Sequence, residues 1–205
     1  MQKAVVGLAL FTSILAGCAT HSGKPSTAIQ PVRETHGYSA EKAVIYTPPA
    51  WPQALPADIY RPDGAGPFPG VLMVHGGGWH EGKRKHMGRF SKMLARRGYV
   101  VVNIDYRLAP QFHFPAQIED LREAVRWMRA NAVSLKLDPM RIGAWGYSAG
   151  AHLVALLGTD NEGPATRVSA VVAGGLPSDF SDYPDSPLIR DFIGATPAEN
   201  PQAWT

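Results

Sequence analysis

The strongest chemical signal in this 205-residue chain is a serine held between glycines. Gly146-Tyr147-Ser148-Ala149-Gly150 has the pattern G-x-S-x-G and lies between an apolar segment of strand character and one of helical character. A sharp turn there lifts the serine hydroxyl clear of a sheet, and glycines let neighbouring backbone pass closely. The helix that follows adds free N–H groups and a positive dipole end. The pattern predicts a nucleophile at Ser148; the alternative is an incidental serine in a turn.

A second signal is the glycine run His75-Gly76-Gly77-Gly78-Trp79, which follows another apolar segment. Consecutive glycines allow backbone N–H groups to point at a substrate oxygen without obstruction by side chains. By itself the run is equally an ordinary glycine turn. With a nucleophile motif downstream, it predicts an oxyanion hole.

These loops need strands and helices to position them. Apolar, β-branched runs predict strands at Val44–Thr47, Ala57–Tyr60, Pro69–His75, Tyr99–Tyr106, Arg141–Tyr147 and Val168–Ala173. Helices are predicted at His86–Arg97, Pro115–Ala132 and Ala149–Leu157. Alternation of strands and helices with short links indicates an α/β fold, with a mostly parallel sheet covered by helices on both faces.

Two further motifs lie between the glycine run and the serine: Asp105-Tyr106-Arg107-Leu108-Ala109-Pro110 and Phe114-Pro115-Ala116. In this order and spacing, the four motifs resemble the α/β-hydrolase superfamily. They are most similar to esterases with an HGGG oxyanion loop, near the hormone-sensitive-lipase-like and feruloyl-esterase-like groups. The resemblance runs from about Val44 to Trp204.

This resemblance implies a serine carboxylic-ester hydrolase that works through an acyl-enzyme on a small-molecule ester and needs no cofactor or metal. Related proteins with similar glycine loops cleave amides or formamides, which leaves that alternative open. The resemblance implies Ser148 as the nucleophile and the backbone N–H groups of Gly77, Gly78 and Ala149 as the oxyanion hole. It also implies a substrate pocket lined by Trp79, His80 and Tyr147, although a packing role for Tyr147 is an equal alternative.

A serine nucleophile also needs a histidine base and an orienting acid, which follow the serine in this superfamily. The only histidine after Ser148 is His152, which lies about 6 Å further along the same helix and is expected to pack against a neighbouring element. His75 is expected to fix the glycine loop by hydrogen bonding. Asp179 is a candidate acid, although capping a turn is the favoured interpretation.

In relatives the acid and the histidine follow two further strands, and this chain stops at Thr205 before either. We therefore expect a C-terminally incomplete sequence, in which Val168–Ala173 forms an open, aggregation-prone sheet edge. The competing hypothesis is an inactive remnant or a binding protein that lacks the triad acid and histidine.

The N-terminus predicts export and lipidation. Lys3 precedes the uncharged stretch Ala4–Gly17, which suits a signal peptide and is short for a membrane span. Leu15-Ala16-Gly17-Cys18 resembles a bacterial lipobox, and Cys18 is the only cysteine. We expect a signal peptide at 1–17, lipidation of Cys18, a flexible tether at 18–40 and the hydrolase domain at 41–205. Since Asp does not follow the cysteine, an outer-membrane lipoprotein of the bacterial envelope is expected; a plain secretory signal is the alternative.

The composition of the chain limits the classes of protein and of binding partner that are expected. Hydrophobic residues make up 45% and charged residues 18% of the chain, which excludes a disordered or multi-span membrane protein. The net charge is +3, and the positive residues are scattered along the sequence apart from Lys83-Arg84-Lys85, so no nucleic-acid partner is expected. The histidines lack carboxylates at ligand spacing, so no metal site is expected. Substrate identity and oligomeric state are not predicted.

Overall fold

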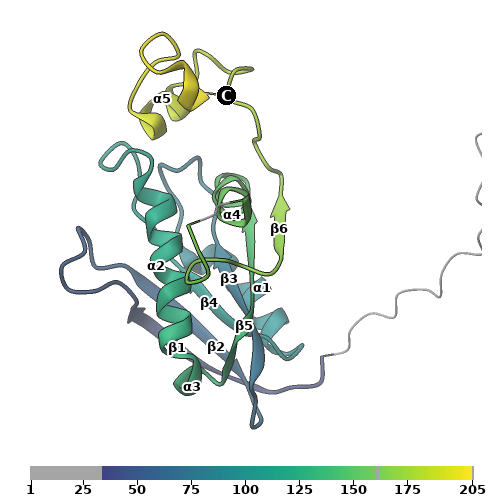
Figure 1. The fold of residues 1–205 in the computed structure, drawn as a ribbon. Coiled ribbons are helices and arrows are strands. Elements are labelled where there is room, and N and C mark those ends of the chain that lie inside the picture. The colour runs from purple at the N-terminus through teal and green to yellow at the C-terminus, as the bar shows by residue number, and fades with distance from the viewer. Residues whose placement is uncertain (1–33, 160–161, 205) are drawn as a thin grey trace, which may run out of the picture. The chain divides into compact units, whose positions relative to one another are not determined.

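Six strands form one mixed sheet in the computed structural model, which describes residues 34–159 and 162–204 (Figure 1). The strands are β1 Tyr38–Ile45, β2 Pro56–Pro62, β3 Phe68–Val74, β4 Val100–Ile104, β5 Leu137–Tyr147 and β6 Val171–Gly174. Their order is β1-β2-β4-β3-β5-β6. The four strands β3 to β6 run parallel, while β1 and β2 pair antiparallel at one edge. The prediction of a mostly parallel α/β sheet is confirmed.

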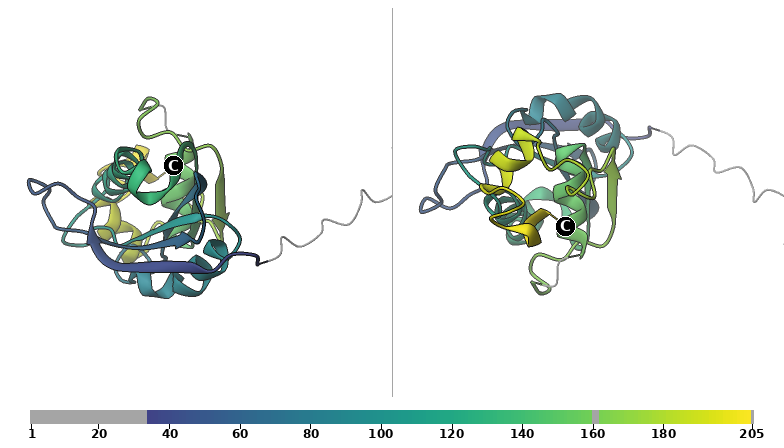
Figure 2. Two further views of the ribbon diagram at one scale, coloured as in Figure 1. Left: turned by 90° about the horizontal axis from the view of Figure 1, so that it is seen from below. Right: turned by 90° about the horizontal axis from the view of Figure 1, so that it is seen from above.

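Helices cover both faces of the sheet. They are η1 Arg84–Met87, α1 Gly88–Ala95, α2 Ala116–Ala130, α3 Ala132–Leu135, α4 Ala149–Thr159, α5 Pro187–Ile193 and η2 Pro201–Trp204. α2 and α4 lie on one face and α1 on the other (Figure 2). None of the helices in the described ranges is long and apolar enough to cross a membrane.

Alternate side chains of the central strands divide between the two faces, as the pleat of a strand requires. Leu72 and Val74 are buried in the larger core, which the side chains of α2 and α4 complete. Val71 and Met73 are buried in a smaller core that includes Met87 and Ala95 from η1 and α1. Because both faces are covered, the central strands read as continuous apolar runs in the sequence.

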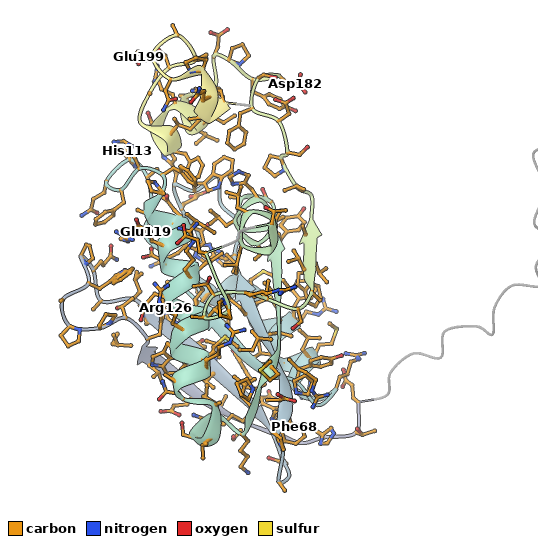
Figure 3. The ribbon with its side chains drawn as sticks, viewed as in Figure 1. Phe68, His113, Glu119, Arg126, Asp182 and Glu199 are labelled. Atoms are coloured by element: carbon orange, nitrogen blue, oxygen red, sulfur yellow. The ribbon has the colours of Figure 1, made fainter. Side chains whose placement is uncertain are left out.

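The parallel strands end at one edge of the sheet, and α5 lies beyond that edge (Figure 1). The loop before α2 contacts α5, and His113 marks the contact (Figure 3). The His113 Nδ1 lies 2.7 Å from the Asp191 carbonyl oxygen, and the Phe114 N–H donates to the Phe192 carbonyl at 2.7 Å. The loops after β3, β4 and β5 and the segment that carries α5 therefore meet at this edge.

Some boundaries differ from the predictions. β1 begins at Tyr38, inside the segment expected as a tether, because Tyr38 pairs with Pro62 of β2. The last strand begins at Val171, three residues later than expected. The expected helix at His86–Arg97 is the short η1 followed by α1, which ends at Ala95. The expected signal peptide, Cys18 and tether residues up to 33 lie outside the described residues.

Candidate active site

Ser148 occupies a tight turn between β5 and α4. Its backbone has a φ of +53°, which non-glycine residues rarely adopt, and its N–H donates to the Gly174 carbonyl at 2.8 Å. A Cβ on Gly146 would lie 2.1 Å from the Gly150 oxygen, and a Cβ on Gly150 would lie 2.5 Å from the His75 oxygen. No side chain fits at either position, so both glycines of the G-x-S-x-G pattern are needed for this turn.

The glycine loop after β3 passes directly beside the serine. A Cβ on Gly76 would lie 3.1 Å from the Ser148 Cβ. Gly77 and Gly78 have φ values of +127° and +57°. The three glycines and Ser148 line one cavity of about 920 Å³. The fold therefore brings the two sequence motifs together at the carboxyl edge of the sheet.

Three backbone amides at this edge are free. Within the described ranges, the N–H groups of Gly77, Gly78 and Ala149 donate to no protein acceptor. Ala149 is the first residue of α4, where the helix leaves its N–H groups without internal partners. The positive end of the α4 dipole lies at the same place. This arrangement suits a negatively charged oxygen that forms on a substrate bound at Ser148.

His80 and Tyr147 lie in the walls of the same cavity. Tyr147 is 60% exposed, so its ring remains available to a ligand. The His80 Nε2 lies 3.5 Å from an Asp191 carboxylate oxygen of α5. Leu188, also from α5, packs against Gly78, where an added Cβ would lie 3.3 Å from its Cδ1. α5 therefore contributes one wall of the cavity.

The prediction that Trp79 lines this cavity is corrected by the structure. The indole is 4% exposed and stacks on Phe192 with ring centroids 4.6 Å apart. It also meets the rings of His152 and Phe180 edge-on, each at 5.4 Å. Burial of a large aromatic ring among other aromatic rings is strongly favourable, and it places Trp79 behind the glycine loop. Trp79 anchors that loop to the core.

His75 is engaged in holding the glycine loop. Its Nδ1 lies 2.8 Å from the Gly76 carbonyl oxygen, and its ring stacks on Tyr106 at 4.3 Å. Burial lowers the pKa of the ring below its usual value. The Tyr106 hydroxyl donates to the His75 carbonyl at 3.1 Å. These contacts agree with the role expected for His75 and leave it no part as a base.

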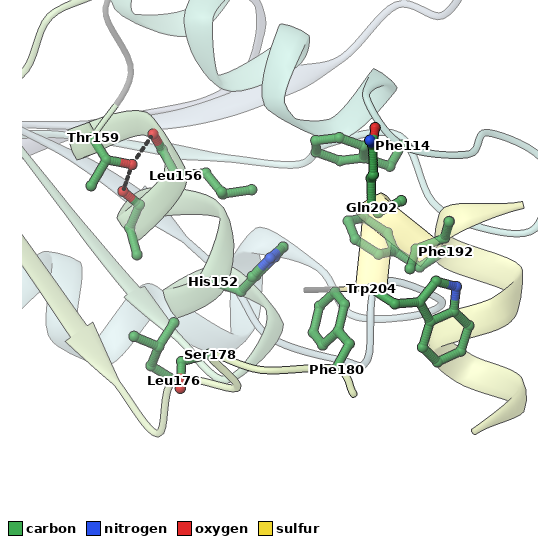
Figure 4. A pocket seen from close by; sticks show the side chains of 13 residues that line it. Phe114, His152, Leu156, Thr159, Leu176, Ser178, Phe180, Phe192, Gln202 and Trp204 are labelled. Carbon is green, nitrogen blue, oxygen red and sulfur yellow. Dashed lines mark hydrogen bonds between the residues drawn. The ribbon is translucent and has the colours of Figure 1, made fainter. Parts of the chain in front are cut away.

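His152 faces a different cavity from Ser148 (Figure 4). Its ring is enclosed by Trp79, Phe180 and Phe192, with centroids 4.9–5.7 Å away. Its Nδ1 is buried and has no hydrogen-bond partner in the described part of the chain. Burial lowers the pKa of His152 to about 4. As expected from the sequence, the side chain packs against its neighbours.

The candidate acid Asp179 is exposed and caps a turn. One oxygen accepts from the Ser181 hydroxyl at 2.6 Å and from the Ser181 N–H at 2.9 Å. These bonds lower the pKa of the Asp179 carboxyl. The structural role that the sequence favoured therefore agrees with the geometry.

Sequence reasoning missed the contribution of α5. Leu188 lines the Ser148 cavity, and Asp191 lies beside His80, only because the chain returns over the sheet edge. The one local signal was Ser186-Pro187, a helix start in which the Ser186 hydroxyl accepts from the Ile189 N–H. That signal predicts a helix and gives no hint of where the helix packs.

Comparisons with known proteins find esterases among the proteins that are similar to this chain. The model of the BD-FAE family matches residues 57–204. Esterase LipC of Mycobacterium tuberculosis is 40% identical over 140 residues, which are 62% of this chain and 35% of LipC. A bifunctional GH43-CE protein of Bacteroides eggerthii superposes with a TM-score of 0.69 and 31% identity over 78% of this chain and 25% of that one. Esterase Est2 of Thermogutta terrifontis gives a TM-score of 0.63 and 25% identity over 77% of this chain and 62% of Est2.

The match spans about a third of the length of the curated relatives, 32% and 35% for the first two. The match of the family model over residues 57–204 includes the strand, turn and helix that carry Ser148.

Proposed function

The chain belongs to the BD-FAE family, and we propose on that premise that it is a serine carboxylic-ester hydrolase that forms an acyl-enzyme at Ser148. The observation that carries the proposal is the meeting of Ser148 with Gly77 and Gly78 at one cavity. The N–H groups of these two glycines and of Ala149, the residue after Ser148, donate to no protein acceptor in the described ranges. A hydroxyl beside preorganised N–H donors is the arrangement that acyl transfer requires.

In the proposed reaction, the Ser148 oxygen attacks the carbonyl carbon of the ester. The carbonyl oxygen becomes an oxyanion and accepts hydrogen bonds from Gly77, Gly78 and Ala149. One such donor is worth about 3 kcal/mol in the transition state of a serine hydrolase. The alcohol leaves with a proton, and the acyl group stays on Ser148. Water then attacks the acyl-enzyme, which releases the acid and restores the hydroxyl.

The attack also needs a base that removes the Ser148 proton. His75 is buried and holds the glycine loop, His152 is half-buried among aromatic rings, and no histidine of the described segment donates to or accepts from the Ser148 hydroxyl. We therefore assign the base to a histidine outside residues 34–159 and 162–204, oriented by an aspartate or glutamate as in other serine hydrolases.

The test compares Ser148→Ala with Ser134→Ala, an exposed serine on α3 that serves as the matched control. With p-nitrophenyl acetate as substrate, we expect Ser148→Ala to lower kcat/KM by at least about 10³-fold. Ser134→Ala should keep the wild-type value. Retention of the wild-type rate in Ser148→Ala would exclude the proposed nucleophile. Comparison of p-nitrophenyl acetate with p-nitroacetanilide separates an esterase from an amidase of the same fold.

We also propose that a lipid on Cys18 anchors the protein to the bacterial envelope, as an outer-membrane lipoprotein. The support is the lipobox-like Leu15-Ala16-Gly17-Cys18 after an uncharged stretch. Several acyl chains hold a protein firmly on a membrane. Cys18→Ser should move the protein from the membrane fraction to the soluble fraction. An unchanged distribution would contradict lipidation at this residue.

A further inference from the structure

A cleft on the α1 side of the sheet gathers positive charge. It has a volume of about 600 Å³, and its walls include Lys42 from β1 and Lys85, Arg89, Lys92 and Arg96 from the η1–α1 segment. The volume falls within the range of small-molecule sites in proteins. Residues far apart in the sequence therefore build one basic cleft.

The four cations of the η1–α1 segment form a stripe. Lys85, Arg89, Lys92 and Arg96 follow one another at steps of four, three and four residues, which places them on one side of a helix. All four side chains are exposed. Like charges at this spacing repel one another, so the stripe is unfavourable unless an anion offsets the charge.

The basic cleft lacks carboxylates that could offset these charges. Its one acidic wall residue, Asp58, already accepts from the Lys42 Nζ at 2.9 Å, the Arg84 Nε at 2.9 Å and the Ala43 N–H at 3.2 Å. Across the described ranges, no carboxylate lies within ion-pair distance of the four stripe cations. Other arginines, such as Arg126, do have such partners.

Two tyrosines hold two cations of the basic cleft in place. The Arg96 guanidinium lies 5.2 Å from the centre of the Tyr38 ring, and the Lys42 ammonium lies 4.2 Å from that of Tyr60. Cation–π contacts of this kind fix a long side chain without neutralising it. The charge is thus both concentrated and partly preorganised.

We propose that the basic cleft binds a phosphate-bearing anion. A phosphate monoester carries between one and two negative charges and several acceptor oxygens, which matches a wall with several cations. Arginine side chains form paired hydrogen bonds with phosphate oxygens. The two arginines of the stripe, Arg89 and Arg96, lie seven residues apart, which is about two helical turns. The cleft is larger than one phosphate group needs, so the ligand is a phosphate ester, either soluble or in a lipid headgroup.

This site is separate from the Ser148 cavity, although one segment borders both. His86, Met87 and Phe90 line the Ser148 cavity, whereas Lys85 and Arg89 line the basic cleft. The proposal does not depend on ester hydrolysis, and binding is measured without turnover.

The test neutralises three stripe cations in the variant Lys85→Gln/Arg89→Gln/Lys92→Gln. The matched control, Arg126→Gln/Arg141→Gln/Arg167→Gln, removes the same charge at exposed positions outside the cleft. Glutamine is a good helix former, so α1 should persist in the stripe variant. Far-UV circular dichroism checks that both variants are folded.

Two arms of the experiment distinguish the sources of phosphate. Calorimetric titration with inorganic pyrophosphate reports a soluble ligand, and co-sedimentation with phosphatidylcholine vesicles, with and without phosphatidylglycerol, reports a lipid surface. In at least one arm we expect the stripe variant to bind at least about tenfold more weakly than wild type, with the control unchanged. No binding by wild type in either arm, or equal loss in both variants, would overturn the proposal.

Discussion

His152 offers a measurable test of how the aromatic cluster behind the glycine loop is built. The substitution His152→Phe replaces the imidazole by an apolar ring among Trp79, Phe180 and Phe192. A cavity of about 360 Å³ borders the side chain and gives room for the larger ring. Near neutral pH, the free energy of unfolding should change by less than about 1.5 kcal/mol.

The substitution should have a larger effect on how the free energy of unfolding depends on pH. In the unfolded chain His152 takes up a proton near pH 6.5, whereas burial lowers its pKa to about 4 in the folded protein. Between these values the unfolded state binds more protons, so stability falls as the pH falls through this window. At about 1.4 kcal/mol for each pKa unit, the full loss is about 3 kcal/mol, and about 2 kcal/mol is lost by about pH 4.5.

Urea unfolding near neutral pH and at about pH 4.5 measures this difference. We expect His152→Phe to gain about 2 kcal/mol relative to wild type on acidification, because it removes the proton uptake. Leu153→Met, at a buried neighbour on the same helix, is the control and should show a difference from wild type that is independent of pH. If the difference in unfolding free energy between His152→Phe and wild type were the same at both pH values, the imidazole would titrate normally and would not be enclosed as described.

Three further predictions concern stability and association. Arg107→Met should lower the free energy of unfolding by about 3–5 kcal/mol, because it leaves the fully buried Asp120 carboxylate without its cation; a urea midpoint unchanged from wild type would contradict this. Gly150→Ala should cost at least about 2 kcal/mol in the same assay, since the new methyl would lie 2.5 Å from the His75 oxygen, and wild-type stability would refute the close approach. Val172→Lys, at a 55% exposed position of edge strand β6, should reduce light scattering on concentration with a stability change below about 0.5 kcal/mol; equal scattering would argue against edge-to-edge association.

Much of the fold could be predicted because its strands and helices have strong local signals. The run over Pro69–His75 reads as a buried strand, and β3 occupies Phe68–Val74. The serine turn was predictable for a similar reason, because Gly146 and Gly150 leave no room for a Cβ and their spacing is therefore visible in the sequence.

Other features depend on long-range packing and could not be predicted. Trp79 follows the glycine loop and was expected at the cavity mouth, but burial against Phe192 from a distant helix determines its direction. The basic cleft is similar: four of its cations lie close together in the sequence, but only the packing of α1 beside β2, which pairs with β1, brings Lys42 next to this stripe. Pairing with β2 likewise extends β1 back to Tyr38, where the sequence alone favoured a tether.

The central claim is that the Ser148 hydroxyl faces the free amides of Gly77, Gly78 and Ala149. A crystal structure of the protein after reaction with a fluorophosphonate tests it most directly. We expect one phosphonyl group on Ser148, with its oxygen about 3 Å from the nitrogens of at least two of these amides. A phosphonyl group on another residue, or a Ser148 adduct whose oxygen points away from all three amides, would contradict the claim.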